Sequence, residues 1–274
     1  IRHSLTNLGY ILTDEPIIMS PHNLGHPQLR ERVFILGVHE SLGIDKLIIN
    51  IPKTNKNQIS FYTSGILEEN EVDDSYNISE YEEYVLNAWD EFIKGVKEWT
   101  IGFPVWSEEF KSINDITSFP KWKRNIIRKN RQLYLNNKCF IDEWLKKYNY
   151  LKSFKPTDRK FEWQCGNNCN TIWDTIIQFR PSGIRVKQPT TFPALVAMVH
   201  IPIIGKYRRR LTPREVANLQ SFPRNFKIHT NVKQAYKQFG NAVNVDVVKY
   251  LAKQLFDIEN QKKIKKTTLF DLLD

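Results

Sequence analysis

The chain has 274 residues, long enough for one large or two small domains, and its formal net charge of +10 indicates a polyanionic partner. It contains no run of about 18 apolar residues, so no transmembrane helix is expected, and Ile1-Arg2-His3-Ser4 is not typical of a signal peptide. Its three cysteines suit a reducing compartment better than a disulfide scaffold, so we expect a cytoplasmic protein. Cys165 and Cys169 have the spacing of half a zinc site, but no second ligand pair is obvious, and no metal site is predicted.

The N-terminal stretch predicts short elements around two arginines. Residues 1–11 indicate the end of a helix that leads through a glycine into a strand, and Ile17–Met19 indicates a second strand. The continuous apolar run 33–38 is typical of a buried strand. Arg30 and Arg32 stand just before it, and on an extended chain they lie on one side, where they can grip a planar acceptor or a phosphate. The alternative is a solvated strand end.

The middle of the chain changes from acidic to basic. Residues 65–84 carry many carboxylates, which favour a solvated connector over a pair for acid–base chemistry. Apolar spacing predicts a helix over residues 81–99. A basic cluster follows and continues into a helix that reaches residue 148. The cluster, with aromatic residues beside it, suits phosphate contacts. Its members are Lys121, Lys123, Arg124, Arg128, Lys129 and Arg131.

A turn between two short strands is predicted over residues 179–187, after a loop-rich, aromatic stretch from 151 to 178. Ser182 and Gly183 allow a tight backbone approach to a partner. Arg180 and Arg185 flank them, together with Lys187, so we expect a loop that contacts DNA. Residues 194–201 form another apolar run and predict a further strand.

The segment 207–250 has the clearest local signals. Thr212, with proline next and Glu215 three residues on, predicts a helix that starts with a capping box. Phe222-Pro223 should stop that helix. A second helix is predicted over 232–239 with Gly240 as a left-handed C-cap, and Asn241 is predicted to cap a third helix over 241–255. Three arginines, Arg208, Arg209 and Arg210, precede the first helix and form a second basic cluster.

The residue order here resembles the last two conserved blocks of the bacterial DNA cytosine 5-methyltransferases. The resemblance lies in Arg-Arg-Leu-Thr-Pro-Arg-Glu at 209–215, Leu-Gln-Ser-Phe-Pro at 219–223 and Gln-Phe-Gly-Asn-Ala-Val at 238–243. Gln28, Arg30 and Arg32 resemble the family's Gln-x-Arg-x-Arg block. The resemblance covers about 1–40 and 180–255 well. Residues 50–180 take the place of the target-recognition domain, which varies within the family.

The resemblance implies roles for individual residues. Arg32 would contact the flipped target cytosine, and Arg30 would support the site and the nearby backbone. Asn241, with Ala242 and Val243, would lie near the methionine end of S-adenosylmethionine. Arg214 and Glu215 would tie the recognition domain to the sheet. Residues expected at DNA are Gln28, Lys123, Arg124, Arg128, Arg180, Ser182, Gly183 and Arg185.

Three features of a whole family member are not found in the sequence. It has no glycine-rich Phe-x-Gly-x-Gly loop, no Glu-Asn-Val, and no cysteine that follows a proline. Attack on cytosine needs a thiolate and an acid, and methyl transfer needs bound S-adenosylmethionine. The chain also does not begin with methionine. We therefore expect a C-terminal portion or second subunit that is inactive alone and needs an N-terminal segment or subunit carrying the Pro-Cys nucleophile.

These observations predict an α/β fold: the C-terminal part of an S-adenosylmethionine-dependent methyltransferase sheet, interrupted by an α+β target-recognition domain. We expect residues 1–50 to end the catalytic domain, 51–205 to form the recognition domain, and 206–274 to return to the catalytic domain with a C-terminal helix. The expected function is methylation of carbon 5 of cytosine in double-stranded DNA, within a restriction–modification system. The alternatives are a DNA-binding specificity module without catalysis and a homologue that acts on RNA.

Overall fold

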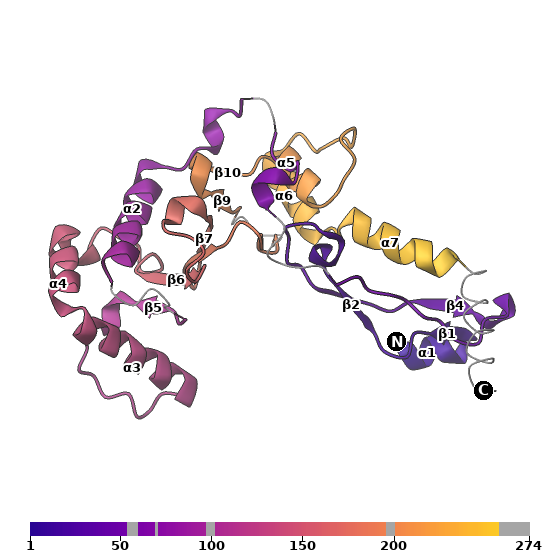
Figure 1. The fold of residues 1–274 in the computed structure, drawn as a ribbon, viewed down its shortest axis with the longest axis horizontal. Coiled ribbons are helices and arrows are strands. Elements are labelled where there is room, and N and C mark those ends of the chain that lie inside the picture. Colours follow the sequence, from indigo (N-terminus) through magenta and orange to yellow (C-terminus); the bar gives the residue numbers. More distant parts are fainter. Residues whose placement is uncertain (54–59, 69–70, 97–101, 196–200, 258–274) are drawn as a thin grey trace.

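The structure is a computed structural model that describes the chain except residues 54–59, 69–70, 97–101, 196–200 and 258–274. Its helices are α1 (Arg2–Asn7), α2 (Glu80–Gly95), α3 (Lys121–Asn136), α4 (Lys138–Lys147), α5 (Pro213–Leu219), α6 (Val232–Asn241) and α7 (Val245–Phe256). Its strands are β1 (Tyr10–Leu12), β2 (Ile17–Met19), β3 (Arg32–Phe34), β4 (Gly37–His39), β5 (Val105–Trp106), β6 (Lys160–Gln164), β7 (Ile176–Arg180), β8 (Gly183–Lys187), β9 (Ile203–Ile204) and β10 (Arg209–Arg210). Helices α3 and α4 lie at one end of an elongated molecule and α7 with β1 and β4 at the other, with α5 and α6 between them (Figure 1).

The largest sheet has six strands in the order β10-β9-β7-β8-β6-β5 within the described residues. β6 and β8 pair in parallel and the other neighbours pair antiparallel, so this α/β fold contains a mixed sheet. The predicted turn between short strands is confirmed as the β7–β8 hairpin, although the stretch before it contains β6 as well as loops. The close approach at Gly183 is made inside the sheet, because a Cβ there would lie 2.8 Å from the backbone oxygen of Lys160. The expected domain boundary at residue 205 falls between β9 and β10 of this one sheet.

Aromatic packing joins the helices of the middle region to this sheet. The ring of Trp89 on α2 stacks on Phe161 of β6 with ring centroids 4.9 Å apart, and Phe92 lies 4.9 Å from Trp144 of α4. Such pairs add about 0.5–1.5 kcal/mol each beyond the area they bury. The helix predicted over 81–99 is confirmed as far as Gly95, where α2 ends, and residues 97–99 lie outside the described part. The one helix predicted from the basic cluster to residue 148 is divided into α3 and α4, because Asn137 between them has non-helical backbone angles.

The N-terminal strands form two antiparallel ribbons, β1 with β4 and β2 with β3. The prediction of one buried strand over 33–38 was wrong. The run divides into β3 and β4, which pair with different partners, and Val33 is 64% exposed. A strand is buried on both faces only when layers cover both. The predicted helix-to-strand passage through Gly9 is confirmed, with φ of +81° at that glycine.

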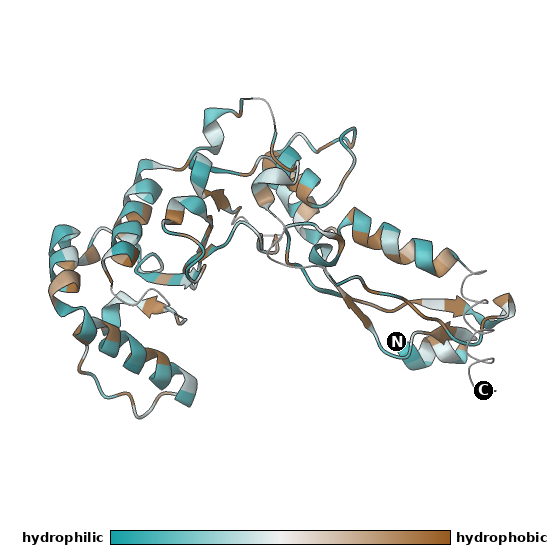
Figure 2. Cartoon of the chain, viewed as in Figure 1, coloured by the Kyte–Doolittle hydropathy of each residue, from teal (hydrophilic) through white to brown (hydrophobic). Residues whose placement is uncertain are grey.

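Helix α7 covers one face of these ribbons. Val247 and Leu251 of α7 pack in one buried cluster with Ile17 and Met19 of β2. Figure 2 shows hydrophobic and hydrophilic residues in alternating bands along α7, as expected for a helix with one packed face. The C-terminal helix therefore returns to the N-terminal strands, as the sequence predicted.

The capping box of α5 is confirmed, but the ends of the next two helices differ from the prediction. Thr212 accepts a hydrogen bond from the amide of Glu215, and the Glu215 carboxylate accepts one from the amide of Thr212. Gly240 is not a left-handed cap: α6 runs through it to Asn241 and ends at Ala242, which is extended. Asn244, not Asn241, caps α7 by accepting from the amide of Val247. Of the strand predicted over 194–201, residues 196–200 lie outside the described part.

Candidate functional site

Arg30 joins three segments that are distant in the sequence. Its side chain is 4% exposed. Its Nη1 donates to the carbonyl of Leu195 at 2.5 Å, and its Nη2 donates to the carbonyls of Gly240 at 2.6 Å and Ala242 at 3.0 Å. Burial, with the nearby charge of Arg32, lowers the pKa of Arg30 to about 10, so the guanidinium stays charged near neutral pH. We call this arrangement the Arg30 junction.

Hydrogen bonds to the backbone also hold the Arg30 junction. The hydroxyl of Ser20 accepts from the amide of Arg30 at 3.0 Å and donates to the carbonyl of Gln28 at 3.2 Å. Next to it, Phe192 and the segment 27–29 exchange two backbone hydrogen bonds. The Gln28 side chain is completely buried here, so no part of it is accessible to DNA in this conformation.

Arg32, two residues on, has the opposite environment. It is exposed, and its paired partner in the β2–β3 ribbon is Met19. Within the described residues its guanidinium makes one hydrogen bond, from Nη1 to the carbonyl of Glu31, at 2.7 Å. Most of its donors therefore face solvent. Arg30 and Arg32 look alike in the sequence, but one holds the backbone together and the other can reach a ligand.

The loop that follows α6 lies against the Arg30 junction. Asn241 and Val243 are exposed, and between them the carbonyl of Ala242 accepts from Arg30. The side chain of Asn244 is buried and donates to the carbonyl of Leu219 at 3.3 Å and to the hydroxyl of Ser221 at 3.0 Å. Arg30 and Asn244 thus hold the turn 241–243 by hydrogen bonds, while the side chains of Asn241 and Val243 stay exposed.

The three arginines of the second basic cluster, residues 208–210, each form an ion pair with a glutamate. Arg209 donates to both carboxylate oxygens of Glu215 at 2.8 Å, and Glu215 is 0% exposed. Glu215 also accepts from the amide of Glu68, so it connects α5, β10 and the segment before α2. The neighbouring arginines pair with the first turn of α2, Arg208 with Glu83 and Arg210 with Glu82.

This network corresponds to the tying role expected of Glu215. Arg214, expected to share that role, instead donates to the carbonyl of Phe226 at 2.9 Å.

Helix α3 carries cations without acidic partners. No ion pair within the described residues involves Lys121, Lys123, Arg124, Arg128 or Lys129. The ammonium of Lys123 lies 3.5 Å from the ring centroid of Phe119, and Arg128 is exposed. Unpaired cations along one helix are suited to phosphate contacts, because each can replace a counterion of the nucleic acid.

A polar network crosses the outer face of the six-stranded sheet. The register places Glu162 of β6 opposite Arg185 of β8, and Arg185 opposite Gln178 of β7. One oxygen of Glu162, Oε2, accepts from Arg180 Nη2 at 2.6 Å and from Arg185 Nε at 2.9 Å. Burial alone raises the pKa of Glu162, but the hydrogen bonds and charges of the two arginines outweigh it and hold the pKa below its ordinary value.

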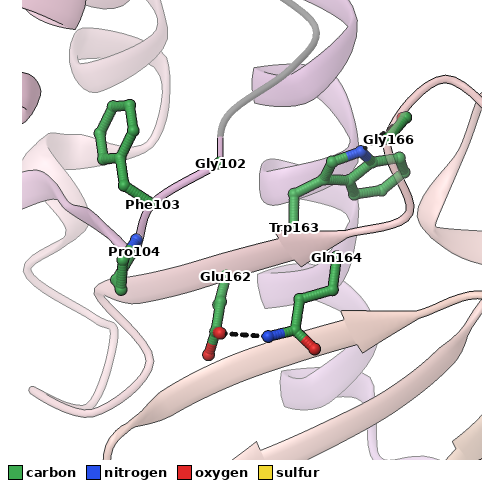
Figure 3. A pocket seen from close by; sticks show the side chains of 7 residues that line it. All are labelled: Gly102, Phe103, Pro104, Glu162, Trp163, Gln164 and Gly166. Atoms are coloured by element: carbon green, nitrogen blue, oxygen red, sulfur yellow. Dashed lines mark hydrogen bonds between the residues drawn. The ribbon is translucent and has the colours of Figure 1, made fainter.

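Figure 3 shows Glu162 and Gln164 on the same side of β6, hydrogen-bonded to each other, with Trp163 on the other side. They line a pocket of about 340 Å³ together with Phe103 and Pro104. The sequence prediction included Arg180 and Arg185 but missed Glu162. The alternation of polar and aromatic residues from 160 to 164 was the available signal for an outward-facing carboxylate.

The model of the C-5 cytosine-specific DNA methylase family matches residues 1–257. The chain belongs to this family. The Type II methyltransferase M.AluI of Cellulosimicrobium cellulans is 27% identical, over 93% of this chain and 66% of its own length. The Type II methyltransferase M.BanI of Aneurinibacillus aneurinilyticus is 24% identical, over 92% of this chain and 65% of its own length. The chain therefore spans just under two thirds of these relatives.

Among solved structures, a DNMT2 mutant of Spodoptera frugiperda aligns with this cytosine-specific methylase chain at a TM-score of 0.41 and 18% identity. The alignment covers 93% of this chain and 61% of the DNMT2 chain. Within the part of the chain that the structure describes, no helix is long and apolar enough to cross a membrane. Three or more potential metal ligands do not gather anywhere in those residues.

The predicted site residues of the methylase fall into three places. Arg30 and the turn 241–243 meet at the Arg30 junction, with Arg32 two residues along the chain. Lys123, Arg124 and Arg128 lie on α3, at the end of the molecule away from α7 (Figure 1). Arg180 and Arg185 lie on the β7–β8 hairpin, with Ser182 exposed at its tip.

Proposed function

We propose that this chain is the DNA-recognition and closing part of a DNA cytosine 5-methyltransferase of a type II restriction–modification system. In the complete enzyme it binds double-stranded DNA, holds the target cytosine and completes the site in which a methyl group passes from S-adenosylmethionine to carbon 5. The family match over residues 1–257 supports the reaction class. The names of the two relatives described above support the biological setting.

The Arg30 junction is the observation that carries the proposal. A single buried guanidinium holds Leu195 and the turn after α6 beside the start of β3. Two stretches that resemble family blocks, 28–32 and 238–243, thereby meet through specific hydrogen bonds. Arg32 emerges next to this point with free donors, so it is placed to contact a base taken out of the DNA stack.

Residues of this chain fit one end of the cofactor. The exposed amide of Asn241 and the backbone of Ala242 and Val243 offer polar groups for the methionine portion of S-adenosylmethionine. The sequence contains no glycine-rich loop for the remainder of the cofactor. When bound, the cofactor supplies the methyl group. The residues of this chain orient the cofactor and the DNA, and they hold the recognition region against helices α5, α6 and α7.

The test is reconstitution. The chain is mixed with the segment that carries a Pro-Cys and a Glu-Asn-Val, encoded upstream or in an adjacent gene, together with labelled S-adenosylmethionine and duplex DNA. The mixture should form 5-methylcytosine, and neither part alone should do so. A mixture that binds DNA without methylating it supports the non-catalytic specificity module instead. Methylation of RNA but not of duplex DNA would favour a homologue that acts on RNA.

A further inference from the structure

We propose that Arg185 reads a guanine in the major groove of the recognised DNA site and that Glu162 is the residue that positions it. The inference rests on the proposed function and adds the base that one side chain recognises. Two groups of cations in this chain differ in their acidic partners. Five cations of α3 have no ion pair among the described residues, and only Arg131 lies near a carboxylate, that of Glu109 at 3.7 Å, whereas Arg180 and Arg185 share one oxygen of Glu162.

The free donors of Arg185 have the arrangement that guanine requires. Its Nε is held by Glu162 at 2.9 Å, and no hydrogen bond to its Nη1 or Nη2 exists among the described residues. The side chain remains 29% exposed. A guanidinium fixed at Nε therefore presents two terminal amino groups in a plane. The O6 and N7 acceptors of guanine accept bidentate donation of this kind from arginine.

The shared carboxylate favours a base over a phosphate. A phosphate beside Arg185 would bring its negative charge close to Glu162, whose pKa is held low so that it stays ionised. The major-groove edge of guanine carries no net charge, so it avoids this repulsion. Lys123, Arg124 and Arg128 on α3 form no ion pair with an acid among the described residues and remain the better phosphate contacts.

The position of Arg185 near an exposed hairpin tip also suits contact with the DNA major groove. Arg180 and Arg185 stand on the two strands of the β7–β8 hairpin, and residues 181 and 182 at its tip are exposed. β8 lies between β7 and β6 in the six-stranded sheet, so the long side chain of Arg185, rather than a free two-stranded ribbon, would reach the base edges in the major groove. Glu162 lies directly opposite Arg185 in the parallel β6–β8 register, so the neighbouring strand holds the arginine from the side.

The experiment uses the full chain and duplexes selected from a randomised pool. Affinity is then measured by fluorescence anisotropy on the selected duplex, with each guanine replaced in turn by 7-deazaguanine, which lacks the N7 acceptor. One guanine should be sensitive to this change with the unaltered chain. Arg185→Ala should bind all four bases alike at that position, losing a discrimination of about 5- to 150-fold, equivalent to the 1–3 kcal/mol of a bidentate contact.

Matched variants separate positioning from charge. Arg185→Lys keeps the positive charge but lacks the two coplanar amino groups of a guanidinium. It should therefore lose the guanine preference and keep the salt dependence of DNA binding. Glu162→Gln should weaken the preference at the same guanine, because Arg185 loses the carboxylate that holds its Nε. Its affinity for unrelated duplexes should stay equal or rise, because a negative charge near the DNA is removed. Lys123→Ala should weaken binding to all sequences and leave the preference intact.

The outcomes are distinct. An Arg185→Ala variant that keeps both the guanine preference and the 7-deazaguanine sensitivity overturns the inference, and so does a selected site with no sensitive guanine. The 7-deazaguanine test is made with the unaltered chain, so its result does not require any variant to fold. A chain that binds no DNA at all refutes the proposed function, and this inference with it.

Discussion

Arg30→Ala should uncouple the two ends of the molecule. The substitution removes three hydrogen bonds from a buried guanidinium to the carbonyls of Leu195, Gly240 and Ala242. One hydrogen bond to a charged group contributes about 1.5–3 kcal/mol, and three on one group do not add in full. Loss of the charge also relieves the desolvation that lowers the pKa of Arg30. We therefore expect a loss of about 3 kcal/mol, against the roughly 5–15 kcal/mol of a whole domain.

The assay is urea unfolding followed by two signals. All seven tryptophans lie between residues 89 and 173, so fluorescence reports only the middle region, whereas far-ultraviolet circular dichroism also reports α5, α6 and α7. The two transitions should coincide in the unaltered chain. In Arg30→Ala the circular-dichroism transition should begin at a lower urea concentration, because α6 and α7 lose the hydrogen bonds from Arg30 to Gly240 and Ala242.

Arg32→Ala is the matched control, two residues away. Its exposed guanidinium makes one hydrogen bond, to the carbonyl of its own neighbour Glu31, so its loss should change stability by no more than about 0.5 kcal/mol. An Arg30→Ala variant that unfolds like Arg32→Ala, with coincident signals, would refute the reasoning about the Arg30 junction.

Further expectations concern activity and binding. In the reconstituted enzyme, Arg32→Ala should lower the single-turnover methylation rate by about 10²- to 10³-fold with little change in DNA affinity, because charge grows on the cytosine during attack; a normal rate in the folded variant contradicts the assignment. Replacing Lys123, Arg124 and Arg128 by alanine should flatten the plot of log affinity against log salt by roughly 0.9 for each phosphate that the variant no longer binds, and an unchanged slope would move the phosphate surface elsewhere. The isolated chain with labelled S-adenosylmethionine should give no 5-methylcytosine, since none of its cysteines follows a proline, and protein-dependent product would contradict this.

Local signals in the sequence were sufficient for most elements. The capping box at Thr212 and Glu215, the helix from residue 80 and the β7–β8 hairpin depend on residues a few positions apart. The family resemblance also rests on contiguous strings, and the family match bears it out. Two helix caps were misplaced by a few residues, and the larger error arose where a distant partner decides the outcome. The apolar run 33–38 is continuous in sequence, but its two halves pair with different strands.

The sequence by itself determined the residue types of the site, and only the tertiary structure decided what each one does. Arg30 and Arg32 are indistinguishable by spacing, yet one binds a carbonyl 210 residues away and the other faces solvent. Glu162 gained its role only through the parallel register of β6 and β8. The physical reason is the same in both cases. A charged side chain takes the partner that packing brings within hydrogen-bond reach, and that partner is set by which strands and helices lie together rather than by its neighbours in the chain.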